Sequence, residues 1–185
     1  ARQLGAATRI FEQSRFPRQK VCGEYLSPEV EPLLESLGVL GEFRARGPHR
    51  MNRLHLHFPR ASKQCRLPES AFGLSRWALD DLLFAHAGPS SRERARPEKG
   101  MVAATGRPAG TQARGPRQFG FKAHHRGAMT DTIELFFFDG CYVGVNGVEG
   151  GATNVCGLGP EDTLRRYGFD PTALLESFEI GRAHV

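Results

Sequence analysis

The sequence predicts a mixed α/β fold, with helices mainly in its first half and an antiparallel sheet in its second. Two segments, residues 28–37 and 75–87, carry apolar side chains at helical spacing. After residue 118, four apolar segments of strand length follow one another, and Asp139-Gly140 is a typical hairpin turn between two of them. These four predicted strands cover residues 119–125, 132–138, 141–146 and 152–158.

The first residues predict part of a nucleotide-binding unit. Residues 1–5 are typical of the last turn of a helix that Gly5 ends, and residues 6–12 of a short buried strand that ends on Glu12. In a dinucleotide-binding βαβ unit, such an acid binds the ribose about 20 residues after a glycine-rich loop. That loop would precede residue 1, so we expect a partial Rossmann-like domain in a truncated chain. A solvated strand end is the alternative interpretation of Glu12.

The remaining elements follow from turn signals and periodicity. Ser27 is suited to the N-cap and Pro28 to the first turn of the helix that Gly38 ends. Alternating side chains at 53–58 predict a half-exposed strand, and Gly88 ends the second long helix. We also expect a polar loop at 89–99, a short strand at 101–105 followed by a turn at Gly106, and short helices at 160–167 and 171–178.

The composition is that of a globular protein. The 185 residues are enough for one domain with its own core, and 39% of them are hydrophobic and 24% charged. We expect a cytoplasmic protein with four reduced cysteines, because the sequence has no secretory signal and no apolar stretch that could span a bilayer. The net charge of +5 indicates an acidic partner such as a pyrophosphate, a nucleic acid or a phosphorylated substrate.

Four motifs, in order along the chain, resemble one family of enzymes. Residues 18–28, Arg-Gln-Lys-Val-Cys-Gly-Glu-Tyr-Leu-Ser-Pro, resemble the K-x-C-G-E-x-L-S-P stretch of FAD-dependent oxidoreductases of the geranylgeranyl reductase group, within the p-hydroxybenzoate hydroxylase-like superfamily. Residues 74–83 match the family's R-x-x-L/F-D-x-x-L helix, and residues 102–107 its A-T-G strand and turn. Residues 142–155 look like the sheet that covers the active site. The resemblance implies FAD as cofactor, an apolar small-molecule substrate and NAD(P)H as one candidate reductant.

The resemblance also assigns roles to individual residues. Cys22 and Gly23 are the catalytic candidates, since a glycine lets the backbone approach a flavin ring closely. The cofactor-binding candidates are Glu12, Arg18, Lys20, Cys22, Gly23, Arg76, Thr105 and Gly106, and the substrate-binding candidates are Tyr142, Asn146 and Glu149. A cation at the start of a helix needs an anion nearby, which favours a cofactor contact for Arg76. The alternatives are a buried structural thiol at Cys22 and solvated loop charges at Arg18 and Lys20.

We predict no metal site from the sequence. His55, His57 and Cys65 suggest zinc ligands, but the two histidines simply share one face of a strand and no closed four-ligand set is present. His124 and His125 would point to opposite faces of a strand, which argues against a shared site for that pair. The arginine-rich residues 44–66 are expected to form a solvated face.

Two domains are expected. Residues 1–50 and 70–115 would form the partial FAD-binding domain, and residues 51–69 and 116–178 the sheet and helices of the substrate domain. Residues 179–185 resemble a translated adapter sequence and are left out of the fold. The family's glycine-rich loop and its later G-D-A region are missing, and the link at 88–100 is short. We therefore do not expect this chain alone to hold FAD tightly.

The expected function is that of a fragment of an FAD-dependent reductase or monooxygenase acting on an isoprenoid, a polyketide or another apolar substrate. Halogenation is disfavoured, since flavin halogenases carry a W-x-W-x-I-P motif and the only tryptophan, Trp77, lies in a predicted helix. Two alternatives stay open. A small basic module that binds nucleic acid would explain the positive charge, and a non-catalytic remnant would need no ligand.

Overall fold

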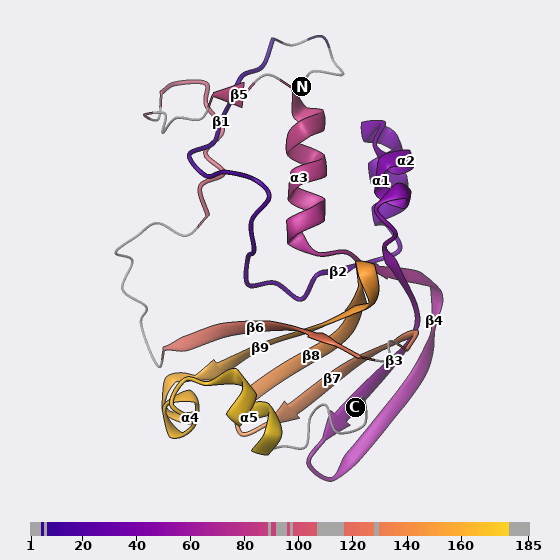
Figure 1. Ribbon diagram of the computed structural model, residues 1–185, viewed down its shortest axis with the longest axis vertical. Helices are drawn as coiled ribbons and strands as arrows, with labels where there is room; N and C mark the ends of the chain where they lie inside the picture. Colours follow the sequence, from indigo (N-terminus) through magenta and orange to yellow (C-terminus); the bar gives the residue numbers. More distant parts are fainter. Residues whose placement is uncertain are drawn as a thin grey trace.

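The centre of the molecule is a seven-stranded sheet with the strand order β2-β4-β3-β7-β8-β9-β6 (Figure 1). The computed structural model describes residues 5, 7–88, 90–91, 96, 98–106, 117–127 and 130–177. Neighbouring strands of the sheet are antiparallel except β3 and β7, which run parallel. The strands are β2 (Tyr25–Leu26), β3 (His49–Phe58), β4 (Ala61–Gly73), β6 (Gln118–Arg126), β7 (Thr132–Phe138), β8 (Cys141–Val148) and β9 (Ala152–Pro160).

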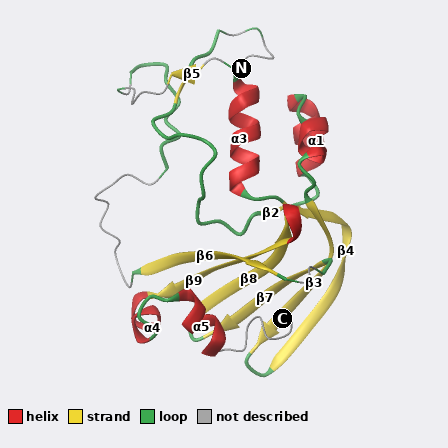
Figure 2. Cartoon of the chain, in the orientation of Figure 1, coloured by secondary structure: helices red, strands yellow, loops and turns green. Residues whose placement is uncertain are grey.

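The helices form two groups, which Figure 2 shows well apart from each other. The first group is α1 (Val30–Leu37), α2 (Leu40–Ala45) and α3 (Arg76–Ala87). It encloses one hydrophobic core with residues at the end of β4: Leu34, Val39, Phe43, Phe72, Leu74, Ala78 and Leu82. The second group is α4 (Glu161–Arg166) and α5 (Pro171–Ser177), which pack on the sheet near β6 and β9.

Pleating gives the sheet two chemically different faces. Alternate residues of β6, β8 and β9 point to one face, where Phe121, Val143, Val145 and Val155 form a core with Leu164 of α4 and Leu174 and Leu175 of α5. We call this the helix face. The intervening residues point the other way, toward the loop of residues 16–24, and we call that side the loop face. Its side chains include Lys122, His124, Tyr142, Asn146 and Asn154.

Most predicted elements are confirmed. The four strands predicted after residue 118 are β6, β7, β8 and β9, and the four predicted helices are α1, α3, α4 and α5. The hairpin between β7 and β8 turns at Asp139 and Gly140, whose φ angles of 43° and 71° are both positive. No helix among the described residues is long and apolar enough to cross a membrane.

Three expectations need correction. The strand at 101–105 is wrong: residues 101–106 have no regular structure, and Val102 is 93% exposed with no described strand beside it to complete a ladder. The strand at 6–12 is reduced to β1 (Ile10–Phe11), which pairs in parallel with β5 (Ser90–Ser91). Side chains at 61–66 are solvated as expected, yet they belong to β4, which was not predicted, because pairing with β3 needs only backbone groups.

Several expectations fall outside the described part of the chain. They are the helical turn at residues 1–4, part of the polar loop at 89–99 and the tail at 179–185.

Gly73 is predicted to be essential for packing β4 against β8. A Cβ added to Gly73 would lie 1.8 Å from the carbonyl oxygen of Gly147, a backbone atom that cannot move aside. We predict that Gly73→Ala lowers the free energy of unfolding by about 3 kcal/mol or more, at the upper end of overpacking costs. Urea denaturation of the wild type and the variant measures this difference in the free energy of unfolding. The control is Gly41→Ala in α2, where an added Cβ meets nothing within 4 Å. Equal stabilities of the two variants would contradict this account.

Candidate functional site

The loop of residues 16–24 is held between α3 and the sheet. At its start, the Phe16 ring packs on Phe84 of α3, with ring centroids 4.8 Å apart. At its end, the Asn154 side-chain amide donates hydrogen bonds to the backbone carbonyls of Cys22 and Gly23, at 3.2 and 2.9 Å. The Asn154 side chain is completely buried, whereas Cys22 is half-buried and Gly23 exposed. One amide group, which has two N–H donors, thereby fixes two consecutive peptides of the loop.

Glu24 joins the loop to both the sheet and α3. Its buried carboxylate lies 2.5 Å from Lys122 Nζ and 2.6 Å from His124 Nε2, and it accepts a hydrogen bond of 2.7 Å from the Arg76 backbone N–H. A buried carboxylate needs such partners, because removal from water costs several kcal/mol for an unpaired ion. Glu24 also adopts a φ of 53°, a left-handed conformation that costs about 1–2 kcal/mol for a residue other than glycine. These contacts therefore hold a strained backbone in place.

The start of α3 is occupied by the protein's own acids. The carboxylate of Glu149 accepts hydrogen bonds from the Ser75 hydroxyl and, at 2.8 Å, from the Ser75 backbone N–H. Ser75 in turn caps the helix by accepting from the Ala78 backbone N–H at 3.1 Å. Together with Glu24, these groups satisfy the first N–H donors of α3 and complement the positive end of its dipole.

Asp80 forms ion pairs with two of the predicted cofactor-binding cations. Arg76 Nε and Nη2 donate to its two oxygens at 2.7 and 2.9 Å, and Lys20 Nζ lies 2.5 Å away. Burial acts to raise the pKa of Asp80, but the hydrogen bonds from Arg76 and Lys20 outweigh it and lower that pKa below its ordinary value. The bond to Asp80 raises the pKa of Arg76, and the nearby Cys22 sulfur adds to this effect.

The thiols at the site are free. No disulfide joins Cys22, Cys65, Cys141 or Cys156. The Cys22 sulfur accepts a hydrogen bond of 3.4 Å from the Glu24 backbone N–H. Burial raises the pKa of Cys156, on the loop face of β9, and the neighbouring Cys22 adds to that rise. The Cys156 thiol is therefore protonated at neutral pH.

The structure brings four predicted cofactor residues into one cluster: Lys20, Cys22, Gly23 and Arg76. The anion that the helix start required near Arg76 is Asp80, so the helix dipole no longer favours a cofactor contact for that residue. The other four candidates lie elsewhere. Glu12 follows β1 and accepts from the Ser14 N–H at 2.7 Å, Arg18 is exposed, and Thr105 and Gly106 are exposed in an irregular segment.

The three predicted substrate contacts differ in their surroundings. Tyr142 is 45% exposed on the loop face of β8, where a ligand could reach it. Asn146 is buried and donates to the Gly147 carbonyl of its own strand at 3.2 Å. Both carboxylate oxygens of Glu149 bind Ser75, which gives this residue a structural role.

Sequence reasoning missed Asp80, Lys122, His124 and Asn154 as site residues. One usable signal was the alternation in β6, where Lys122 and His124 lie on the polar face of the strand, opposite Phe119, Phe121 and Ala123. Another was the pair of asparagines at 146 and 154, which are register partners in β8 and β9.

Space is open beside the fixed part of the loop. A Cβ added to Gly23 would meet no heavy atom within 4 Å, so a flat ligand could approach the backbone there. The Asn154 Oδ1 atom is buried and has no hydrogen-bond partner in the described part of the chain. The open space beside Gly23 would let a planar ring lie against the fixed backbone, whereas the buried Asn154 Oδ1 atom is out of reach of such a ring.

Asn154 is predicted to control the order of the loop. Asn154→Leu removes the donor of two hydrogen bonds to the loop, which should cost about 1–3 kcal/mol of unfolding free energy. It should also speed trypsin cleavage after Arg18 and Lys20. Asn146→Leu is the matched control, because its bond lies within β8 and does not hold the loop. Unchanged cleavage in Asn154→Leu, or equal cleavage in both variants, would contradict the role of Asn154.

Asp80 is predicted to make stability depend on acid pH. Because the folded-state pKa is lowered, the ion pairs contribute stability above the unfolded pKa, and this contribution is lost as pH falls through the folded value. Urea unfolding of wild type and Asp80→Asn between about pH 6 and about pH 2 measures it. We expect the difference between the two proteins to shrink toward acid pH. Parallel profiles would be the contrary result.

The comparisons with known proteins locate the fold. No family model matches the chain, and no curated protein matches it. A flavoprotein/dehydrogenase from Cytophaga hutchinsonii superposes with a TM-score of 0.72 at 14% identity, over 95% of this chain and 55% of its own. CmlS, a flavin-dependent halogenase, gives 0.72 at 15% identity, over 100% of this chain and 44% of its own.

A third structure, PqsL, is a probable FAD-dependent monooxygenase from Pseudomonas aeruginosa. It gives a TM-score of 0.61 at 11% identity, over 89% of this chain and 57% of its own. The chain thus spans about half the length of these solved structures. At such identities the likeness shows the fold alone. The chain has the α/β fold of a portion of flavin-dependent enzymes.

Proposed function

We propose that this chain is part of an FAD-dependent oxidoreductase in which residues 18–24 lie beside the flavin ring. The observation that carries the proposal is the Cys22–Gly23 backbone, which Asn154 and Glu24 fix to the sheet while the space beside Gly23 stays open. The shared fold with flavin-dependent enzymes supports it. When bound, FAD would supply the redox chemistry, and the protein groups would orient the ring and exclude water.

The adenosine half would bind near β1. Glu12 follows this strand, which lies beside a parallel neighbour, β5, as the acid of a dinucleotide-binding unit requires. Arg18 is exposed and free to meet an acidic group. Lys20 and Arg76 both pair with Asp80, so we assign them the task of positioning the loop. Thr105 and Gly106 lie in an exposed irregular segment, and this segment would have to move for them to contact the cofactor.

The substrate would lie between the loop and the sheet. The loop face offers Tyr142 and a mixture of apolar and polar side chains, which suits an isoprenoid or polyketide with a polar end. In this proposal, residues 51–69 and 116–178 form the substrate domain, and residues 1–50 and 70–115 the partial FAD-binding domain. Reduction of a double bond and hydroxylation with NAD(P)H as reductant are the two reactions proposed, in a cytoplasmic enzyme.

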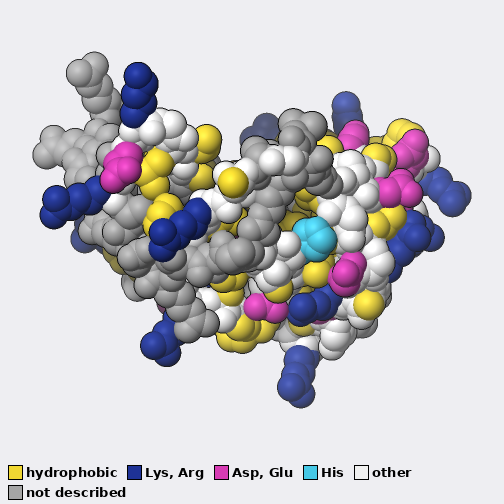
Figure 3. All heavy atoms as spheres, turned by 90° about the horizontal axis from the view of Figure 1, so that it is seen from above, with side chains coloured by type: hydrophobic (Ala, Val, Ile, Leu, Met, Phe, Trp, Pro, Cys, Tyr) yellow, Lys and Arg dark blue, Asp and Glu magenta, His cyan; other side chains and the backbone are white. Residues whose placement is uncertain are grey.

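Two competing functions have less support. Trp77, the only tryptophan of the sequence, lies in α3 and is 46% exposed, and with a single tryptophan the sequence does not contain the W-x-W-x-I-P motif of flavin halogenases. On the face drawn in Figure 3, the described Lys and Arg side chains are scattered, with acidic side chains among them, whereas a nucleic-acid-binding module should gather them in one stripe.

FAD binding is the decisive test. Extending the chain upstream along its gene, by about 20 to 30 residues that include GxGxxG, is predicted to give a yellow protein that quenches flavin fluorescence. A colourless extended protein in excess FAD would end the proposal.

Gly23→Ala in the extended protein tests where the ring lies. Its methyl group would enter the open space and should weaken FAD binding at least tenfold, whereas Gly41→Ala in α2 should leave the affinity unchanged. Equal affinities for both variants would overturn the placement of the loop beside the flavin.

A further inference from the structure

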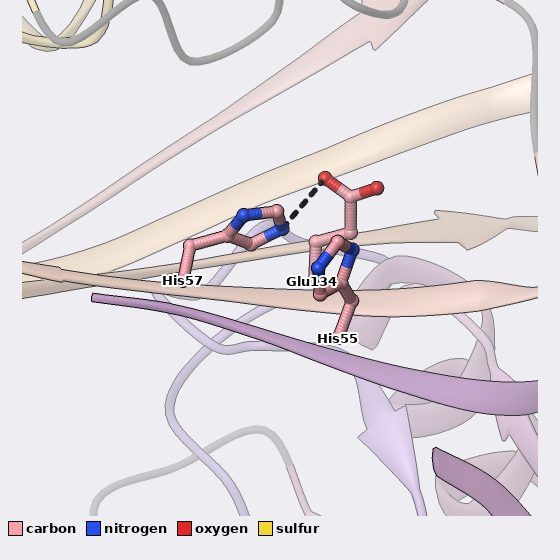
Figure 4. A group of neighbouring side chains, drawn as sticks. All are labelled: His55, His57 and Glu134. Carbon is pink, nitrogen blue, oxygen red and sulfur yellow. Dashed lines mark ion pairs between the residues drawn. The ribbon is translucent and has the colours of Figure 1, made fainter. Parts of the chain in front are cut away.

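Two histidines and a glutamate meet on the helix face, where β3 and β7 run parallel. His55 and His57 are two residues apart in β3 and therefore share a face, and Glu134 of β7 is the register partner of His55. The ligand atoms of these three side chains all lie within 4.8 Å of one another. Figure 4 shows the Glu134 carboxylate pointing toward the His57 ring, with the His55 ring on the same side of the strands.

The separations are close to those of metal ligands. The His57 Nε2 atom lies 3.7 Å from a carboxylate oxygen of Glu134. Two donors on one tetrahedral zinc ion, each about 2.0–2.2 Å from the metal, are roughly 3.4 Å apart. Side-chain rotations would bring the three ligand atoms, which lie within 4.8 Å of one another, to this spacing. Phe136 stacks on the His57 ring at 4.2 Å with an interplanar angle of 7°, which orients that imidazole.

The site is accessible yet sheltered. The side chains of His57 and Glu134 are 28% and 15% exposed, so an ion could enter and would lose part of its contact with water. Imidazole nitrogens with one carboxylate suit zinc and similar transition metals, whereas calcium and magnesium prefer oxygen ligands throughout. The flavin chemistry proposed above uses none of these residues.

We propose that His55, His57 and Glu134 bind a divalent transition-metal ion of the zinc type, which ties β3 to β7 and keeps one coordination position for water. The sequence alone pointed away from a metal, because the two histidines share a strand face in any case and no closed four-ligand set was found among them and Cys65. Cys65 is the register partner of Leu54, so it lies on the opposite face from the two histidines. Glu134 replaces it from a distant part of the chain. The inference is independent of the flavin proposal, because the two sites occupy opposite faces of the sheet.

Cobalt titration of the chain, first freed of metal with EDTA and dialysed, tests the site. We expect a visible d–d absorption band that saturates at one equivalent and disappears on addition of Zn²⁺. A near-ultraviolet thiolate-to-cobalt charge-transfer band should be missing, because no cysteine belongs to the set. Zn²⁺ should also raise the melting temperature of the wild-type chain.

Matched variants identify the ligands. Glu134→Gln and His55→Gln should each weaken Zn²⁺ binding at least tenfold in calorimetry and abolish the thermal shift. His125→Gln should do neither, since His125 is an exposed residue of β6. Far-ultraviolet circular dichroism checks that each variant is folded. If one of the two ligand variants does not fold, the other still tests the site. Failure of the wild-type chain to bind at millimolar metal, a thiolate band, or unchanged binding by the folded ligand variants would each overturn the proposal.

Discussion

The buried carboxylate of Glu24 is the interaction on which the candidate site depends. It is the point where the loop, the edge strand β6 and the start of α3 meet, through Lys122, His124 and the Arg76 backbone. Because a buried charge cannot be left unpaired without a large cost, separating the loop from β6 would leave the Glu24 carboxylate without its cationic partners. The strained φ of Glu24 fits this view, since the surrounding contacts must outweigh it.

The sheet separates two chemical environments. Its loop face carries polar side chains that fix a backbone segment and leave open space beside Gly23. Its helix face is apolar beneath α4 and α5 and carries two histidines and a glutamate where β3 meets β7. The pleat makes this separation possible within single strands, because successive residues of β6 or β7 point to opposite faces. One face therefore serves the proposed flavin chemistry and the other the proposed metal.

The elements that local patterns specify were predictable. The strands β6 to β9 alternate clearly, and Asp139-Gly140 sets the hairpin between β7 and β8. The failures have physical causes. The apolar run at 101–105 has no described strand beside it, and the exposed first half of β4 shows no apolar alternation. Whether each of these segments forms a strand depends on a pairing partner elsewhere in the chain, which the local sequence does not indicate.

The site was predictable only in part, for the same reason. Lys20, Cys22, Gly23 and Arg76 were found through a motif, and the structure does bring them together. Their partners were missed, because Lys122 and His124 are 98 and 100 residues away from Glu24 in sequence. The same holds for Glu134, which only the parallel pairing of β3 and β7 places beside His55.

A double-mutant cycle between Glu24 and Lys122 measures the central claim most directly. The free energies of unfolding of wild type, Glu24→Gln, Lys122→Met and the double variant give the coupling between these two side chains. If their contact fixes the loop to the sheet, each single variant is destabilised and the coupling exceeds about 1 kcal/mol. Additive effects within about 0.5 kcal/mol would show that the two groups act separately, and the account of the site would then be wrong.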